Sequence, residues 1–426
     1  MSILVSNKTH ILDLSSEALA AELDQLHMPK FRTKQIQEWI FQKRASSFEQ
    51  MTNLSLADRQ ILGERFAIFT SEELRKLTAP DGTEKILLSW PTVRPARGRS
   101  EAAEDEAPSP EIGAEGRIAD ILSVIPDTTA GETPALRNAG VPPASELADA
   151  SQTSGAYLTE TVMIPCDDDQ CDEYGNTTVA HRRTVCLSTQ VGCPVQCKFC
   201  ASGLEGLKGH LSGGQIIEQA LRLQHTLPPE RRLTNVVFMG MGEPLANLNA
   251  TVQAIKTLMA PWGFAISGRK ITVSTVGLPP QMKRLADLEL PITLAISLHA
   301  PNDVLRRKII PWAHRISLDQ IIDAGRYYFD KTGRELTLEY IMLDGVNTLP
   351  EHARQLAAVA KQLRANVNLI YFNEVPGMEF KRPSGITVFA FQNTLRGLHV
   401  NCHIRKSRGR EIAAACGQLA RQEGIV

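Results

Sequence analysis

The sequence has no cysteine before Cys166, few aromatic residues (5%) and no apolar run approaching the length of a membrane span. A bilayer-crossing helix needs about 18 or more consecutive apolar residues, so the sequence predicts none. The first residues, Met1–Lys8, also lack the basic-then-apolar order of a signal peptide. The eight cysteines are clustered in the later part of the chain, which argues against the disulfide framework of a secreted protein. We therefore expect a cytoplasmic protein with no membrane contact.

Aromatic residues are absent altogether from residues 91–155, which contain eight prolines and many Ala, Glu, Ser and Gly residues. Such a segment buries too little apolar surface to offset the entropy of ordering it. It holds 5 Lys and Arg against 11 Asp and Glu, so the rest of the chain is mildly basic although the formal charge of the whole is -1. We predict a disordered insertion that enlarges a loop between two strands, Lys85–Trp90 and Tyr157–Ile164.

The 426 residues, 43% hydrophobic and 22% charged, suit a globular protein of two or three domains. Apolar periodicity in residues 34–43 and 56–62 predicts a helical N-terminal domain over residues 1–80. Residues 81–90 and 156–182 read as a strand extension that leads into a core at 183–404, and residues 405–426 form a C-terminal segment.

Short β-rich runs alternate with helical stretches through the core, which predicts an α/β fold with a parallel sheet, either open or a partial barrel. In such folds the functional site lies at the carboxyl ends of the strands. The predicted strands are Thr184–Ser188, Asn235–Met239, Lys270–Ser274, Ile292–Ser297, Glu335–Met342 and Asn366–Tyr371.

Cys193, Cys197 and Cys200 follow the first of these strands in a Cys-x3-Cys-x2-Cys pattern. Three thiolates can hold three irons of a 4Fe-4S cluster and leave the fourth iron open to bind and reduce another molecule. The alternatives are zinc, which prefers four ligands in two separated pairs, and three unrelated buried thiols.

The other predicted strands also end in polar or glycine residues. Each of these features alone is more often a plain turn or a hydrogen-bonded structural histidine. Because they all fall at one edge of the sheet, we expect them to hold a ligand together. They are Gly242, Glu243, Ser274, Ser297, His299 and Asn373.

The chain resembles the radical S-adenosylmethionine enzymes, and within them the RlmN and Cfr group of RNA adenosine methyltransferases. The resemblance covers nearly everything except the insertion, and it implies a partial (βα)6 barrel with one 4Fe-4S cluster on Cys193, Cys197 and Cys200. It rests on Cys186–Cys193 leading into the cluster motif, Met239–Leu245, Ala295–Asn302, Ala415–Leu419 and, in the N-terminal domain, Phe31–Trp39.

The resemblance also implies a reaction that uses two molecules of S-adenosylmethionine per turnover. The first methylates Cys416, and a radical from the second abstracts hydrogen from that S-methyl group, after which the carbon radical adds to an adenine ring. Cys186 then releases the product by forming a transient disulfide with Cys416, and Glu160 accepts the ring proton. The residues implied to bind S-adenosylmethionine are Gly242, Glu243, Ser274, Ser297, Leu298, His299 and Asn373.

From the residues alone, Cys186 reads as a buried strand residue, Glu160 as an exposed strand carboxylate and Cys416 as a helix-packing residue. The implied substrates are carbon 2 of an adenosine in 23S rRNA and of the adenosine 3′ of the anticodon in tRNA. The N-terminal basic residues Arg32, Lys34, Lys43 and Arg44, with the basic stretch after His403, suit a polyanion. A reductant such as flavodoxin or ferredoxin and a monomeric state are expected.

Several alternatives stay open. Carbon 8 could replace carbon 2 as the methylated position, and the chain could be another radical enzyme or a non-enzymatic iron-sulfur regulator or RNA-binding protein. The lack of cysteine before Cys166 argues against a methylthiotransferase, which carries a second cluster in its N-terminal domain. The segment Pro165–Gly175 is longer than the family pattern, which weakens the placement of Glu160. Its added cysteines, Cys166 and Cys171, are either spare thiols or metal ligands.

Overall fold

The computed structural model describes residues 8–95, 157–166 and 182–419. Apart from residues 91–95, the predicted insertion lies outside these described residues, as do Cys171 and most of the segment Pro165–Gly175. Arg94–Pro95, at the start of the predicted insertion, form strand β5, which pairs with β9.

One sheet forms the centre of the molecule, in the strand order β15-β14-β13-β12-β11-β10-β7-β6-β4-β3. The strands from β7 to β15 are parallel, and β6, β4 and β3 extend the sheet in antiparallel fashion. Its strands are β3 (Glu72–Thr78), β4 (Glu84–Trp90), β6 (Tyr157–Cys166), β7 (Arg182–Cys186), β10 (Asn235–Phe238), β11 (Ile271–Thr275), β12 (Thr293–Ser297), β13 (Thr337–Met342), β14 (Asn366–Tyr371) and β15 (Cys402–Arg405). Two small sheets join β1 (Thr9–His10) to β2 (Phe66–Ala67), and β5 to β9 (Leu207–His210) and β8 (Gln190–Gly192).

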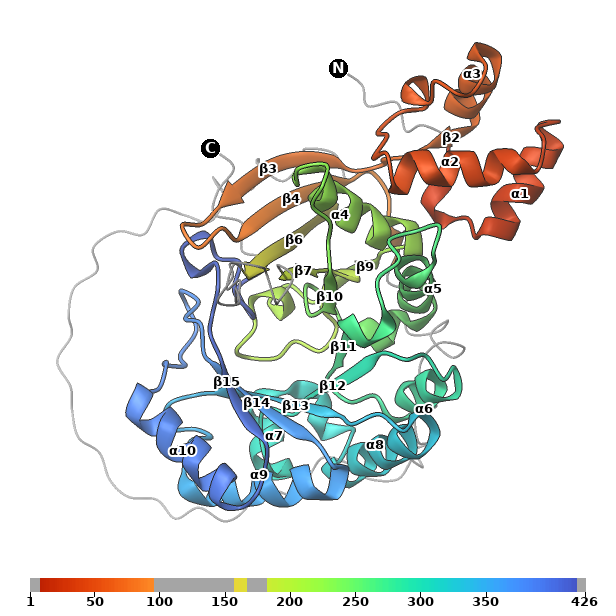
Figure 1. The fold of residues 1–426 in the computed structure, drawn as a ribbon. Coiled ribbons are helices and arrows are strands. Elements are labelled where there is room, and N and C mark those ends of the chain that lie inside the picture. The colour runs from red at the N-terminus through yellow and green to blue at the C-terminus, as the bar shows by residue number, and fades with distance from the viewer. Residues whose placement is uncertain (1–7, 96–156, 167–181, 420–426) are drawn as a thin grey trace, which may run out of the picture.

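Helices follow the parallel strands and lie along the outside of the curved sheet (Figure 1), as a parallel sheet requires. The α-helices are α1 (Ser16–Gln25), α2 (Phe31–Phe41), α3 (Leu56–Arg65), α4 (Gly213–His225), α5 (Leu248–Met259), α6 (Pro279–Asp287), α7 (Asp303–Ile309), α8 (Leu318–Thr332), α9 (Pro350–Leu363) and α10 (Gly385–Gly397). Short 3-10 helices are η1 (Ile11–Asp13), η2 (Phe48–Gln50), η3 (Ala201–Gly203), η4 (Pro244–Asn247), η5 (Gly268–Lys270), η6 (Pro311–His314) and η7 (Arg410–Ile412). Together the strands and helices form the α/β partial barrel that the sequence predicted.

The two faces of the sheet differ in polarity. On β12, Leu294 and Ile296 are completely buried in the core, whereas Ser297 alternates with them and lies on the opposite, inner face. Ser297 is in register with Glu339 of β13, and Glu339 with Asn368 of β14. A row of polar side chains therefore crosses the inner face of the barrel.

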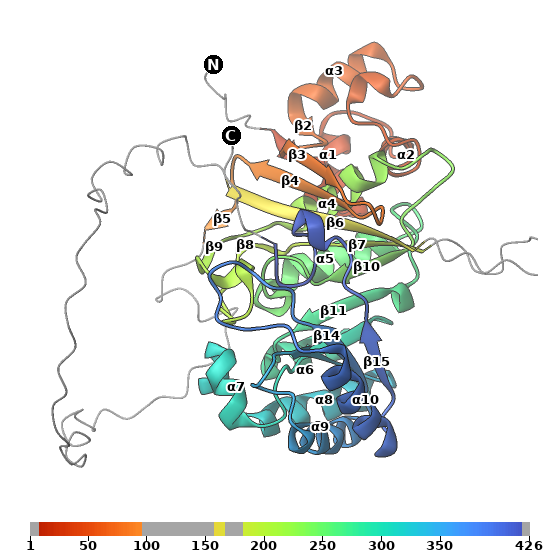
Figure 2. The same cartoon turned by 90° about the vertical axis from the view of Figure 1, so that its left-hand side faces the viewer.

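The N-terminal helices dock on the barrel through α4 (Figure 2). The buried carboxylate of Glu218 accepts hydrogen bonds from the backbone N–H groups of Thr70 (2.8 Å) and Ser71 (2.9 Å) and from Arg222 Nε (3.1 Å). Arg44 Nη1 donates to the backbone oxygens of Gln224 (3.0 Å) and Leu227 (2.7 Å), where α4 ends. The Arg44 bonds cap the carboxyl end of α4, and together with the Glu218 bonds they fix the N-terminal domain against this helix.

Several elements differ from the sequence prediction, among them helix α10 and strands β8 and β9, which were not predicted. Residues 72–78, expected within the helical domain, form β3, an edge strand whose side chains are nearly all exposed and therefore show no apolar alternation. Helix α7 and strand β15 were not predicted, since both are short and rich in Arg, Lys or His. No helix within the described residues is both long and apolar enough to cross a bilayer.

Candidate active site

The three motif cysteines lie in a loop after β8, on the carboxyl side of β7. Backbone bonds hold this loop to distant elements: Cys193 N donates to Gly206 O (3.0 Å) and Lys198 N to Ile309 O at the end of α7 (3.0 Å). Gly192 has φ 73°, and a Cβ there would lie 1.9 Å from Gly206 O, so only glycine permits this approach. These contacts fix the conformation of the cysteine loop against its neighbours.

Cys193, Cys197 and Cys200 are unpaired and half-buried, and they lie close enough to affect one another. Burial, reinforced by the charge on Cys200, raises the pKa of Cys193 to about 12. Burial and the charges of Cys200 and Cys193 also raise the pKa of Cys197. Three thiolates held together in this way need a positive centre.

Among the residues that the structure describes, no three His, Cys, Asp or Glu side chains converge as a single metal ion requires. A tetrahedral zinc ion, with Zn–S bonds of about 2.3 Å, needs sulfurs that nearly touch. A 4Fe-4S cluster binds each thiolate to a different iron and so accepts wider spacing. The donor set therefore fits the cluster better than zinc.

The turn after β10 presents Glu243 to the same edge of the sheet. Gly242 has φ 103°, and Glu243 is 3% exposed. Its Oε1 accepts from Leu245 N (3.0 Å) and its Oε2 from Val276 N (2.8 Å). Burial raises the pKa of this carboxyl to about 7, so an ammonium group arriving nearby would stabilise its charged form.

Ser274 and Ser297 meet across β11 and β12, with their hydroxyl oxygens 3.0 Å apart. His299 follows with φ 57°, and its Nδ1 accepts from Ile341 N (3.1 Å). Burial, with Arg306 nearby, lowers the pKa of His299 to about 3, so the ring is neutral. Leu298 is fully buried, and its backbone N–H donates to Glu339 O (3.1 Å) while its backbone oxygen accepts from Arg306 Nε (3.2 Å).

Asn373, just after β14, connects the barrel to the C-terminal segment. Its Nδ2 donates to Cys416 O (3.1 Å), whereas its buried Oδ1 has no hydrogen-bond partner among the described residues. A buried amide oxygen without a partner is costly, and its position suits a ligand that donates a hydrogen bond.

Cys186 and Cys416, 230 residues apart in sequence, interact in the fold. Cys186 ends β7 and packs with Val162, Met241, Ala414 and Leu419 in a small apolar cluster. Burial, followed by the charge of Cys416, raises the pKa of Cys186 to about 12. Cys416 is exposed to solvent, yet enough protein surrounds its sulfur that burial raises its pKa as well, against the opposing effect of Arg405.

Glu160 lies on β6 beside Cys186. Val162 is in register with Cys186, so Glu160, two residues earlier, lies on the same face of the sheet. Its Oε1 is 2.7 Å from Lys85 Nζ, and the two side chains are 8% and 7% exposed. Lys85 Nζ also donates to Ala413 O (3.2 Å), which links this buried ion pair to the segment that carries Cys416.

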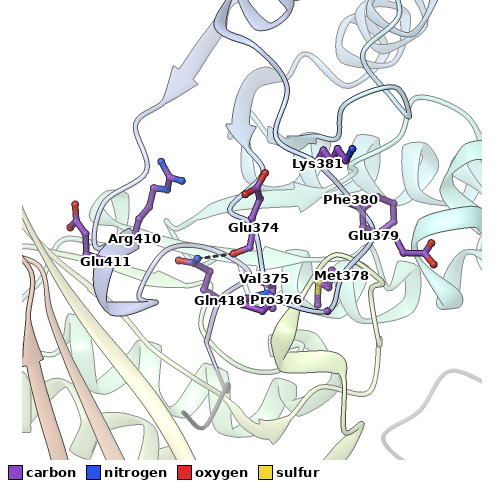
Figure 3. Close-up of a pocket in the computed structure, with 11 residues that line it drawn as sticks. Glu374, Val375, Pro376, Met378, Glu379, Phe380, Lys381, Arg410, Glu411 and Gln418 are labelled. Carbon is purple, nitrogen blue, oxygen red and sulfur yellow. Dashed lines mark hydrogen bonds between the residues drawn. The ribbon is translucent and has the colours of Figure 1, made fainter. Parts of the chain in front are cut away.

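A pocket opens beside this segment, between the loop after β14 and the C-terminal residues (Figure 3). Gln418 Nε2 donates to Glu374 O across the pocket (3.2 Å). Glu374 directly follows Asn373 in the sequence, and Gln418 lies two residues after Cys416. The pocket lining is Glu374, Val375, Pro376, Gly377, Met378, Glu379, Phe380, Lys381, Arg410, Glu411 and Gln418.

The structure therefore brings the sequence-predicted residues to one end of the barrel, and it adds residues that were not predicted. Glu339 is buried on the inner face, and its Oε1 accepts from Asn368 Nδ2 (3.0 Å) and Arg405 Nη1 (3.3 Å). A charged residue inside the apolar strand sequence Leu336–Met342 was the available signal for Glu339. Lys85 and Arg306 gave no such signal.

The chain is similar to known proteins over nearly its whole length. Residues 187–357 match the Radical SAM superfamily, and residues 9–68 match the ribosomal RNA large subunit methyltransferase N-terminal domain. A probable dual-specificity RNA methyltransferase RlmN of Rhodopirellula baltica is 37% identical over 98% of this chain and 92% of its own length.

The chain belongs to the RlmN family. A second RlmN relative, the dual-specificity RNA methyltransferase of Syntrophus aciditrophicus, is 36% identical over 97% of both chains. A crystal structure of a radical SAM methyltransferase from Sphaerobacter thermophilus superposes with a TM-score of 0.76 at 32% identity, covering 97% of this chain and 99% of that one. The predicted fold class, the enzyme class and the 4Fe-4S and S-adenosylmethionine cofactors are confirmed by this membership.

Proposed function

We propose that this RlmN-family chain methylates carbon 2 of an adenosine in 23S rRNA and of the adenosine 3′ of the anticodon in tRNA. The observation that carries the proposal is the packing of Cys186, beside Glu160, with Ala414 and Leu419, which lie on either side of Cys416 in the C-terminal segment. The RNA class is supported by the curated relatives, which are named dual-specificity RNA methyltransferases.

In this proposal Cys193, Cys197 and Cys200 hold the cluster, and S-adenosylmethionine lies against Gly242, Glu243, Ser274, Ser297, Leu298, His299 and Asn373. The bound cofactors supply a methyl cation equivalent and a carbon-centred radical. Glu243 pairs with the ammonium group of S-adenosylmethionine, and the unpartnered Oδ1 of Asn373 accepts a hydrogen bond from it.

Cys416 attacks the sulfonium methyl carbon as its thiolate, so a sulfur–carbon bond forms as the sulfonium–methyl bond breaks. After the methyl carbon has been joined to the adenine, Glu160 takes the ring proton. Cys186 then forms a disulfide with Cys416, which breaks the sulfur–carbon bond to the product; the thiol proton of Cys186 completes the methyl group, and the one electron left over would return to the iron-sulfur cluster. The register of β6 and β7, which places Glu160 and Cys186 on one face, supports this division of roles.

Two of the four basic residues considered in the N-terminal domain are engaged in contacts within the protein. Arg44 is engaged by backbone oxygens at the end of α4, and Arg32 pairs with Asp58 (2.8 Å). Lys34 and Lys43 are exposed, and the ion pair that Lys43 forms with Glu38 (3.3 Å) is itself exposed to solvent. We propose that these two lysines and the basic stretch after His403 contact phosphates. We further propose that a flavodoxin or ferredoxin supplies the electron and that the enzyme is a monomer.

To test the proposal, the chain is expressed in a bacterial strain that lacks its own RlmN-family enzyme. Nucleosides from the rRNA and tRNA of that strain are then analysed by mass spectrometry. We expect 2-methyladenosine in both RNAs with the wild-type chain and none with Cys416→Ala, whose purified form still binds the cluster and cleaves S-adenosylmethionine. The variant Cys186→Ala should accumulate an RNA–protein adduct, since no thiol remains to release it. Appearance of 8-methyladenosine instead, or product formation by Cys416→Ala, would refute the proposal.

A further inference from the structure

Arg306 of α7 is buried, with 1% of its surface exposed, and it forms no ion pair within the described residues. The charge of Asp303, one turn earlier on α7, acts on Arg306 less strongly than that of Cys197, and the Asp303 carboxylate accepts a hydrogen bond from Leu318 N (2.9 Å). A buried charge without an opposite charge costs several kcal/mol, so the site is incomplete as it stands.

The guanidinium group is held rigidly at the end of the barrel. Arg306 Nε donates to Leu298 O (3.2 Å) and Nη2 donates to Val276 O (2.6 Å), and these oxygens follow β12 and β11. The N–H of the same Val276 donates to Glu243. Both carbonyls carry only partial charge, so they orient the guanidinium without neutralising it.

The missing negative charge lies on the side of the cysteine loop. The carboxyl end of α7 accepts a hydrogen bond from Lys198 N, which places Cys197 next to the helix. Burial lowers the pKa of Arg306 to about 10, and attraction to Cys197 is the largest effect that opposes this. The same attraction opposes the rise in the pKa of Cys197.

We propose that Arg306 is the resident counter-charge of the iron-sulfur cluster and raises its reduction potential. A 4Fe-4S cluster on three thiolates carries net negative charge, which increases by one when an electron enters. A fixed cation at short range in a low-dielectric interior favours the reduced form. The inference rests on the proposed ligand set of Cys193, Cys197 and Cys200, which is tested separately by the iron content of their alanine variants.

The experiment measures the reduction potential of the reconstituted cluster by an EPR-monitored titration with a one-electron reductant, in the absence of S-adenosylmethionine and RNA. Arg306→Gln keeps N–H donors for the two carbonyls but removes the charge, and Arg306→Lys keeps the charge. Arg307→Gln is the matched control, because Arg307 is the next residue on α7 and is exposed.

We expect Arg306→Gln to lower the equilibrium constant for reduction by at least about tenfold, equivalent to roughly 59 mV for one electron. The reduction potential of Arg306→Lys should lie between those of Arg306→Gln and the wild type, and the potential of Arg307→Gln should equal that of the wild type. If Arg306→Gln takes up no cluster, uptake by Arg306→Lys still supports the counter-charge, whereas failure of both variants overturns it.

An unchanged potential in Arg306→Gln also overturns the proposal. If that variant instead binds S-adenosylmethionine more weakly at equilibrium, the counter-ion of Arg306 is the carboxylate of that ligand and not the cluster. Equal potentials for the Gln and Lys variants, both below the wild type, would show that the carbonyl contacts matter and the charge does not.

Discussion

The buried pair of Lys85 and Glu160 allows the structural and chemical roles of Glu160 to be separated. Their charged atoms are 2.7 Å apart and both side chains are less than a tenth exposed. Removing one partner of such a pair leaves an uncompensated buried charge and costs about 3–5 kcal/mol, whereas replacing both with apolar residues of similar volume is close to neutral. Lys85→Met should therefore destabilise the fold by about 3–5 kcal/mol, slightly more because the bond to Ala413 O is also lost.

A double-mutant cycle provides the assay. The variants Lys85→Met, Glu160→Met and their combination are compared by thermal melting, in which each single change should lower the melting temperature by roughly 5–10 °C. The double variant should recover most of that loss, with a coupling free energy of at least about 2 kcal/mol. It should nevertheless yield no methylated RNA, because no group remains to take the ring proton.

Two results would refute this reasoning. If the two substitutions are additive in stability, the pair is not the coupled unit that its geometry indicates. If the stable double variant still forms methyladenosine at the wild-type rate, Glu160 is not the proton acceptor. Lys76→Met is a suitable control, since Lys76 forms a more exposed ion pair with Glu84 on the neighbouring strands (3.4 Å) and should cost less than about 1 kcal/mol.

Three further predictions concern the strand ends. Because the pKa of His299 is lowered to about 3 in the folded chain, the unfolded chain binds more protons between pH 6.5 and 3. The stability that this group contributes therefore falls as the pH is lowered through that window. The melting temperature of His299→Gln should accordingly fall less between pH 7 and 4 than that of the wild type. Gly240→Ala should cost about 1–3 kcal/mol in a melt, since its Cβ would lie 2.6 Å from Ser188 Oγ and 2.7 Å from Leu187 O; an unchanged melt would contradict this. Asn373→Leu should weaken S-adenosylmethionine binding by about tenfold in equilibrium dialysis, with Asn368→Leu as a matched control; equal affinities would argue against a ligand role for Asn373.

The sequence predicted the elements whose patterns are local. Buried parallel strands such as Asn235–Phe238 are continuous apolar runs, and glycines and polar residues mark their ends, so the edge of the sheet and Glu243, Ser297 and His299 could be located in advance. The short helix α7 and edge strand β15 lack such patterns. The resemblance to the RlmN and Cfr group supplied the roles of Cys186 and Cys416, which no periodicity indicates.

Pairings between distant residues could not be predicted. The strands that carry Lys85 and Glu160 were expected on either side of the insertion, but no sequence pattern indicated the register that brings these two side chains together. Glu339 meets Arg405 only because β13 and β15 both adjoin β14. The three consecutive residues Arg306–Lys308 are all basic, yet the first is buried and the other two are exposed. Charge in a sequence does not reveal which way a residue on a short helix faces.

The C-terminal segment is fixed almost entirely through its backbone. Gly409 N donates to Asp81 (3.0 Å), while Ala413 O accepts from Lys85 and Cys416 O from Asn373. Farther along, Gly417 O accepts from Ala201 N beside the cysteine loop (2.8 Å). These partners come from separate parts of the fold, so the position of the segment depends on the barrel, on the strand extension and on the cysteine loop together.

Backbone anchoring has a chemical consequence for Cys416. Because the main-chain oxygens bear the contacts, the thiol side chain is left exposed and able to change rotamer while its Cα stays in place. In the proposed reaction Cys416 would first accept a methyl group and then present it to an adenine, so its sulfur would have to reach two partners from one fixed point. The same segment packs with Cys186 through Ala414 and Leu419, which supports the proposed disulfide between Cys186 and Cys416.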